Sequence, residues 1–181
     1  SGKTIIAIAS LLLVIEKNLQ GAFMVPTEVL AEQHYKNLLK YLNPLLVSVE
    51  LLTGNTPQKK RKEIFSNLNN GLVDILVGTH ALFEDKVIFN ALGMVVIDEQ
   101  HRFGVTQRNR LLNKGENTNL LSMTATPIPR TLALSIYGDL DVSQITELPP
   151  GRVPITTKII SEDDLTNLFK IVEDEINKGK Q

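Results

Sequence analysis

The chain has 181 residues, of which 43% are hydrophobic and 22% are charged, and it contains no cysteine. These values are typical of one compact globular domain and exclude a disordered chain, a fibrous chain, a disulfide-stabilised miniprotein and any thiolate site. The formal net charge of −1 would argue against a dedicated nucleic-acid binder. This sum hides an acidic end, because residues 161–181 carry six acidic and three basic side chains and leave the rest mildly basic.

No segment has the composition of a membrane span or a secretory signal. The longest apolar run, residues 5–15, is far shorter than the roughly 20 residues that cross a bilayer, and we interpret it as a buried helix. The chain starts at Ser1 without a Met, and no small-residue cleavage site follows the apolar run. We therefore expect a piece of a longer, cytoplasmic protein.

Short β-branched runs alternate with helical patterns along the chain. Strands are predicted at residues 22–25, 46–51, 73–77, 94–97, 120–123 and 155–160. Helices are predicted at residues 3–17, 28–41, 58–68, 107–112 and 129–137, with a short turn near Ala81. Strands that are apolar throughout are typical of a parallel sheet covered on both faces. The pattern therefore predicts a doubly wound, mostly parallel α/β fold in three layers, α/β/α.

Polar residues follow nearly every predicted strand. They lie at residues 26–28, 53–55, 78–80, 98–101 and 124–127. Ligands of such sheets bind beyond the carboxyl ends of the strands, so these segments are the candidate site.

The start of the first predicted helix has the pattern that ends a phosphate-binding loop. The residues are Ser1, Gly2, Lys3 and Thr4. Backbone N–H groups at the helix start would hold phosphate oxygens, Lys3 would reach the β and γ phosphates, and the Thr4 hydroxyl would bind Mg²⁺. This four-residue match is weak by itself.

A second element strengthens the nucleotide hypothesis. The apolar strand predicted at residues 94–97 is followed by Asp98 and Glu99. In a phosphoryl-transfer site Asp98 would hold the Mg²⁺ shell and Glu99 would activate the attacking water. The alternative is that these two acids only cap the next turn and that Lys3 is a surface lysine.

The densest basic cluster follows Pro57 and comprises Lys59, Lys60, Arg61 and Lys62. It could contact phosphate, or it could be the solvated first turn of a helix. We favour the solvated turn because short charge runs are common on protein surfaces.

Several motifs of the chain resemble those of superfamily 2 helicases. Residues 98–101 resemble the DExH form of motif II, and residues 124–126 resemble motif III, which couples hydrolysis to movement. Longer strings resemble the RecG DNA helicases, at residues 26–34, 78–82, 98–105, 123–131, 138–143 and 147–152. Asn55 and Thr106 depart from the usual residues of that family. The transcription-repair coupling translocases share some of these strings, but Gln100 favours RecG.

The resemblance implies a RecA-like P-loop motor that uses ATP and Mg²⁺ to move on double-stranded DNA. It would remodel branched DNA in repair and recombination, reversing stalled forks and migrating four-way junctions. The implied partners are DNA, a second RecA-like domain and a wedge domain, in a monomer that contacts no membrane. An alternative from a different class of function remains open: the chain could be a nucleotide-dependent DNA-binding module that does not turn over ATP.

The resemblance also implies residue roles beyond the nucleotide site. Residues that would relay the nucleotide state are Gln100, His101, Thr124, Ala125, Thr126 and Arg130. Residues that would face the DNA backbone are Pro26, Thr27, Thr53, Gly54, Gly78, Thr79 and His80. His101 could instead be a structural histidine, and the threonines and glycines could be ordinary turn residues.

The predicted domain organisation has three parts. Residues 1–148 form the first RecA-like domain, residues 149–154 a linker, and residues 155–181 the opening strand and helix of the second domain. The last helix has an apolar stripe at Leu165, Leu168, Phe169, Val172 and Ile176. Because this helix would have no further part of its own domain to pack on, we expect the stripe to be partly exposed.

Overall fold

The computed structural model of the protein describes residues 2–125, 141–145, 157, 159, 161 and 165–179. The chain divides into two compact units, Ser1–Ile145 and Thr146–Gln181. The domain bounds expected from the sequence stay a prediction.

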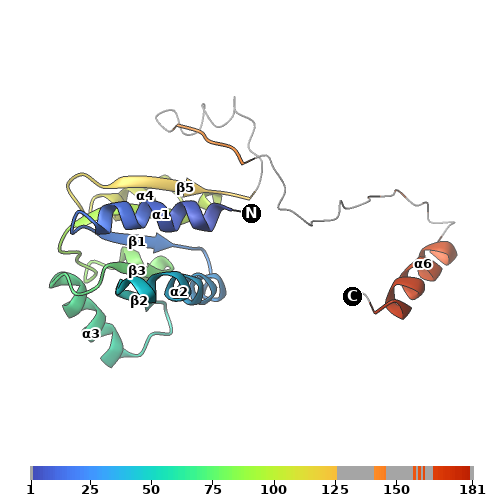
Figure 1. Cartoon of the computed structure of the whole chain (residues 1–181), viewed down its shortest axis with the longest axis horizontal. Coiled ribbons are helices and arrows are strands. Elements are labelled where there is room, and N and C mark those ends of the chain that lie inside the picture. The colour runs from blue at the N-terminus through green and yellow to red at the C-terminus, as the bar shows by residue number, and fades with distance from the viewer. Residues whose placement is uncertain are drawn as a thin grey trace. The chain divides into compact units, whose positions relative to one another are not determined.

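The described elements follow the predicted alternation of helices and strands (Figure 1). The α-helices are α1 (Lys3–Ile15), α2 (Glu28–Leu42), α3 (Gln58–Asn69), α4 (Val105–Leu112) and α6 (Leu165–Asn177). The strands are β1 (Gln20–Met24), β2 (Val49–Leu52), β3 (Ile75–Gly78), β4 (Leu92–Asp98) and β5 (Asn119–Met123). Short 3-10 turns are η1 (Asn43–Leu45), η2 (His80–Phe83) and η3 (Gln100–Arg102).

The five strands form one parallel sheet in the order β2-β3-β1-β4-β5, which confirms the predicted doubly wound α/β fold. Met24 at the end of β1 is opposite Gly78 of β3 and Ile97 of β4. Leu52 at the end of β2 is opposite the same Gly78. The carboxyl ends of these strands therefore meet at one edge of the sheet.

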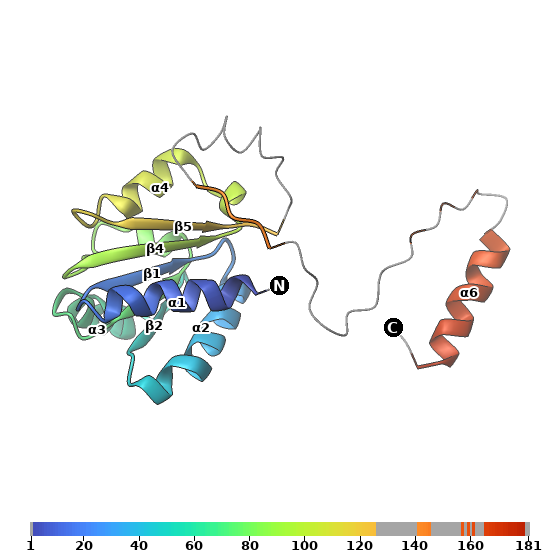
Figure 2. The ribbon, with the colours of Figure 1, turned by 45° about the horizontal axis from the view of Figure 1, so that its top comes forward.

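Helices cover both faces of this sheet, as the three-layer prediction requires (Figures 1 and 2). Successive strand residues point to opposite faces, so β1 sends Phe23 one way and Ala22 and Met24 the other. The core on the first face joins α1 and α2 to the sheet through Ala7, Leu11, Ala31, Leu38, Phe23, Val77 and Val96. The core on the second face joins α3, η2 and α4 to the sheet through Ile64, Leu68, Leu82, Leu111, Met24, Leu76 and Ile97.

Gly78 is required by the close approach of β2 and β3. A Cβ atom at this position would lie 2.2 Å from the carbonyl oxygen of Leu52. Gly78 therefore has a structural role in the sheet, whatever it contributes to a ligand site.

The strand predicted at residues 46–51 begins too early. Pro44 lies in the 3-10 turn η1, and Leu46 closes that turn in the left-handed region with φ of 60°. Leu46 is 93% exposed, and β2 begins only at Val49. The apolar side chain at Leu46 suggested a strand, but the turn that ends α2 governs its backbone.

The interpretation of residues 5–15 as a buried helix is wrong for one face. Ala7 and Leu11 are fully buried against the sheet, whereas Ile5 is 54% and Leu13 63% exposed. The reason is geometric, since the sheet contacts α1 from one side only. Among the described helices, none is long and apolar enough to cross a membrane.

Two predicted elements lie outside the described residues, the helix at 129–137 and, apart from Thr157 and Ile159, the strand at 155–160. Helix α6 forms within the predicted range, and its apolar stripe is partly exposed as expected, with Phe169 68% and Ile176 61% exposed.

Candidate nucleotide and nucleic-acid site

The start of α1 is open to a ligand. Gly2 precedes the helix, the first turn contains no acidic residue, and no side chain of the described residues caps that turn. Among the described residues, nothing lies within 4 Å of where a Cβ of Gly2 would be. The first N–H groups and the positive end of the helix dipole therefore keep the capacity to bind an anion. Lys3 and Thr4, both half-buried, occupy this first turn, and Ser1 lies outside the described residues.

Asp98 ends β4 at the same edge of the sheet. Its Oδ1 accepts a hydrogen bond from the Glu99 backbone N–H at 3.1 Å, and its Oδ2 lies 3.2 Å from Nε2 of His34. Burial by itself would raise the pKa of Asp98, but the bond and charge of His34, the charge of Lys3 and the Glu99 N–H together lower it. The charge of Lys3 therefore acts on Asp98, and the lowered pKa favours the carboxylate.

Glu99 adopts the left-handed conformation, with φ of 53° and ψ of 51°. This region is uncommon for a residue other than glycine and costs on the order of 1 to 3 kcal/mol, and such strain concentrates at functional sites. The conformation turns the chain from β4 into η3. The Oε1 atom of Glu99 accepts a bond from the backbone N–H of Ala125 at 3.4 Å, which joins the segments after β4 and β5.

The other predicted coupling residues are placed only in part. Gln100 is 5% exposed, and within the described chain its buried Nε2 has no hydrogen-bond partner. Thr124 is half-buried beside Ala125 at the end of β5. The side chain of His101, and all of Thr126 and Arg130, lie outside the described structure.

The predicted DNA-facing residues gather at the carboxyl edge of β1, β2 and β3, but not all reach the surface. Thr27, Gly54 and His80 are exposed, and Pro26 is half-buried. Thr53 is 7% exposed and Thr79 1%. Thr27 also caps α2, because its Oγ1 accepts from the Leu30 N–H at 3.3 Å.

The loop after β2 is held from two sides. On one side, Glu28 accepts bonds from the backbone N–H and the side-chain amide of Asn55. On the other side, Nη2 of Arg61 donates to the carbonyl oxygens of Thr53 at 2.7 Å and Gly54 at 3.4 Å. The loop is thereby tied to both α2 and α3.

The predicted solvated basic turn at residues 59–62 is wrong for Arg61. Arg61 is 9% exposed, and its Nη1 also pairs with Glu84, which follows η2. Lys60 pairs with Glu50 of β2 at 2.8 Å. These partners, Glu50 on β2 and Glu84 after η2, are revealed by no charge pattern, and only Arg61 is turned inward, because the Lys60 side chain is 42% exposed.

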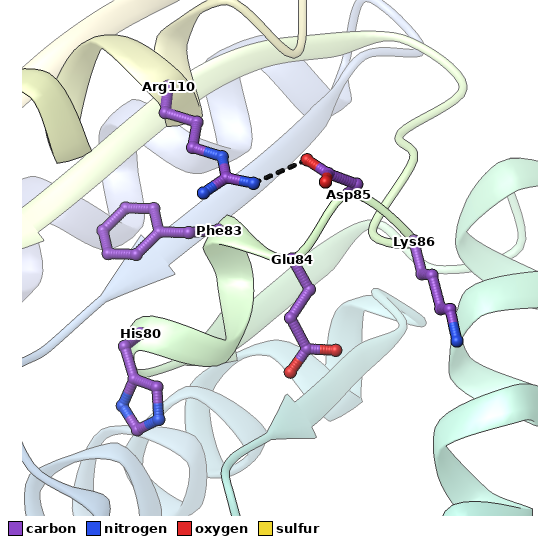
Figure 3. Close-up of a pocket in the computed structure, with 6 residues that line it drawn as sticks. All are labelled: His80, Phe83, Glu84, Asp85, Lys86 and Arg110. Carbon is purple, nitrogen blue, oxygen red and sulfur yellow. Dashed lines mark hydrogen bonds and ion pairs between the residues drawn. The ribbon is translucent and has the colours of Figure 1, made fainter.

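Two shallow hollows flank η2. The first, of about 450 Å³, is lined by His80, Phe83, Glu84, Asp85, Lys86 and Arg110 (Figure 3). Arg110 and Asp85 face each other across it in an ion pair of 2.6 Å. The second, of about 490 Å³, is lined by Gln58, Arg61, Lys62, Phe65, Glu84 and Lys86. Their mixed charges do not define a ligand, and neither hollow is lined by Lys3 or Asp98.

Sequence reasoning missed His34. Its position could have been noticed, because His34 interrupts the inward stripe of α2 formed by Ala31, Leu38 and Leu42. A polar side chain in that stripe must find a partner in the interior. Only the tertiary structure shows that this partner is Asp98.

The sequence model of the DEAD/DEAH box helicase family matches residues 1–134. The chain belongs to this family. Over its whole length it is 53% identical to the ATP-dependent DNA helicase RecG of Synechocystis sp. (strain PCC 6803) and 52% identical to RecG of Aquifex aeolicus. It spans 22% and 23% of those two proteins. The resemblance to the RecG helicases is therefore confirmed, for a segment that is about a quarter of their length.

A solved structure supports the fold. The crystal structure of the DUF1998 helicase MrfA matches 76% of this chain and 25% of its own, with a TM-score of 0.60 and 19% identity. At this identity the likeness shows a helicase-type α/β fold and carries nothing about individual residues. The roles of the site residues stay predictions.

Proposed function

We propose that this chain is the ATP-binding part of a RecG-like DNA helicase motor that remodels branched DNA in repair and recombination. One observation carries the proposal: the charge of Lys3, at the open start of α1, helps to lower the pKa of the Asp98 carboxyl group at the end of β4. A cation, free helix N–H groups and a carboxylate at the end of the neighbouring strand are what a phosphoryl-transfer site needs.

In this proposal ATP lies at the start of α1. The backbone N–H groups at residues 2–4 and the Lys3 ammonium bind the phosphates, and Ser1 contributes as part of the same loop. Thr4 and Asp98 are the residues that would hold Mg²⁺. Among the described residues no cluster of three or more His, Asp or Glu side chains could enclose a metal, which fits an ion held mainly by phosphate oxygens and water. Bound there, Mg²⁺ would neutralise charge that develops on the phosphates.

Glu99 is the proposed general base for the attacking water. Its carboxylate already accepts from Ala125, so a change at Glu99 on hydrolysis can be felt by the segment after β5. Gln100, His101, Thr124, Thr126 and Arg130 complete the proposed relay.

DNA binds, in this proposal, at the neighbouring edge formed by the ends of β1, β2 and β3. The exposed Thr27, Gly54 and His80 donate to phosphate oxygens, contacts that fix position without reading sequence. The buried Thr53 and Thr79, with Pro26 and Gly78, shape the edge from behind. In the whole protein, a monomer in the cytoplasm, the second RecA-like domain and the wedge domain would complete the binding surface.

The test is ATP hydrolysis by the protein at the full length of its RecG relatives, with and without branched DNA. Glu99→Gln should lower the DNA-stimulated rate by about 100-fold or more, the usual range for loss of a general base. The exposed Glu116→Gln is the matched control and should hydrolyse ATP like the wild type. Equal rates for wild type and Glu99→Gln would contradict the enzyme and leave a DNA-binding module without turnover.

A further inference from the structure

His34 is a buried histidine that ends the RecG-like string at residues 26–34 and to which the sequence assigned no role in the site. It lies on the inward face of α2, and its side chain is 10% exposed. The ring is tilted by 33° against the ring of Phe23, with the centroids 4.8 Å apart. Phe23 is fully buried in β1, so the core fixes the plane of the imidazole.

The direction of the hydrogen bond to Asp98 follows from the acceptor. An ionised carboxylate only accepts, so Nε2–H of His34 donates to Oδ2 across 3.2 Å. The other ring nitrogen, Nδ1, is buried and has no hydrogen-bond partner in the described part of the chain. The polar function of this ring is therefore directed at Asp98.

Within the described part of the chain, each oxygen of Asp98 makes one hydrogen bond. Oδ2 accepts from His34, and Oδ1 accepts from the backbone N–H of Glu99 at 3.1 Å. Two donors at opposite oxygens fix the rotation of the carboxylate. Lone pairs remain on both oxygens for a water or an ion, because a carboxylate can accept about four bonds.

We infer that His34 is a positioning residue that holds the Asp98 carboxylate in the orientation needed to bind the Mg²⁺–nucleotide complex. The inference rests on the proposed function. Residues that orient a metal-binding carboxylate typically change metal affinity or activity by 10- to 100-fold when they are replaced. The sequence separation of 64 residues makes this pair a product of the fold.

A merely structural role makes a different prediction. If His34 only filled space beneath the sheet, an apolar side chain of similar size would serve equally well. His34→Leu keeps bulk and removes the donor, whereas His34→Gln keeps an amide N–H at a similar reach. His34→Asn offers the same amide on a shorter side chain that does not reach Asp98. Leu38→Ala is the control for damage to the same helix and core, because Leu38 is fully buried.

The experiment measures binding of the fluorescent nucleotide mant-ADP by the full-length protein as Mg²⁺ is titrated. His34→Leu and His34→Asn should raise the Mg²⁺ midpoint by about 10-fold or more, and His34→Gln should recover most of this loss. Leu38→Ala should lower the melting temperature and leave the Mg²⁺ midpoint unchanged. Binding of mant-ADP without Mg²⁺ should be the same in wild type and the His34 variants, because Lys3 and the start of α1 remain intact.

Several outcomes would overturn the inference. A wild-type Mg²⁺ midpoint in His34→Leu would show that the donor is dispensable, and equal loss in His34→Gln and His34→Asn would show that reach to Asp98 is irrelevant. If His34→Leu fails to fold, the comparison of His34→Gln with His34→Asn tests the inference by itself. Absence of Mg²⁺-dependent binding in the wild type, together with absent ATP hydrolysis, would overturn the proposed function as well. Normal wild-type binding with unaffected His34 variants would overturn only the role of His34.

Discussion

The guanidinium of Arg61 connects three segments through its two terminal nitrogens. It donates to the carbonyls of Thr53 and Gly54 and pairs with Glu84, so the loop after β2 and the end of η2 share one partner. Arginine suits this position because its planar fork presents several donors in fixed directions. Both segments belong to the edge where we propose that DNA binds.

Arg61→Ala should destabilise the chain by about 2 to 3 kcal/mol, because it removes charge-assisted hydrogen bonds and leaves the buried carbonyl of Thr53 without this donor. Arg61→Lys should lose part of the same stability, because one ammonium group cannot reproduce the donors of the guanidinium fork. Urea unfolding of the 181-residue chain followed by circular dichroism measures both changes. The exposed neighbour Lys62→Ala should stay within about 0.5 kcal/mol of the wild type, and an equal loss in Lys62→Ala would refute the role given to Arg61.

At the scale of elements, α2 links the two halves of the candidate site. Thr27 caps its start, Glu28 in its first turn holds Asn55, and His34, nearly two turns further on, holds Asp98. One helix therefore contacts the loop after β2 and the carboxylate at the end of β4. The helix packs into the core through Ala31, Leu38 and Leu42, which are fully buried.

The pairing of β2 with β3 depends on Gly78. Gly78→Ala would push a methyl group against the Leu52 carbonyl and should cost about 1 to 3 kcal/mol, the usual range for overpacking. The matched control is Gly104→Ala, because a Cβ there would have only the Gln107 Oε1 nearby at 3.9 Å. Thermal unfolding of both variants provides the comparison. A Gly78→Ala variant as stable as Gly104→Ala would mean that β2 and β3 separate at little cost.

At the scale of the whole molecule, the two compact units differ in what supports them. The unit Ser1–Ile145 has a sheet covered on both faces, whereas α6 is the one α-helix described in Thr146–Gln181. A helix of 13 residues is marginal in water unless it buries its apolar stripe. The stability of α6 is therefore expected to depend on further partners.

Hydrogen exchange should reveal this difference. In the 181-residue chain the amides of α6 should exchange much faster than those of β1 and β4, because local opening of an unsupported helix costs little free energy. At the full length of the RecG relatives the same amides should gain protection. Equal protection of α6 and the sheet in the 181-residue chain would contradict the expectation.

The sequence by itself determined the parts of this protein that depend on neighbouring residues. Apolar runs located the strands of the sheet. The helix-start pattern at Lys3 and the acidic pair that begins with Asp98 at the end of β4 indicated a candidate nucleotide site, whose residue roles stay predictions. Errors arose where a local pattern was ambiguous, as at Leu46, whose apolar side chain belongs to a turn.

The tertiary structure alone decided which distant side chains meet. His34 and Asp98 are 64 residues apart, and Arg61 and Glu84 are 23 apart, and no periodicity connects either pair. The structure likewise decided which threonines reach the surface, because Thr53 and Thr79 are buried whereas Thr27 is exposed. The physical reason is that the order of parallel strands differs from their order in the chain, so contacts at the sheet edge are set by the packing of α2, α3 and η2.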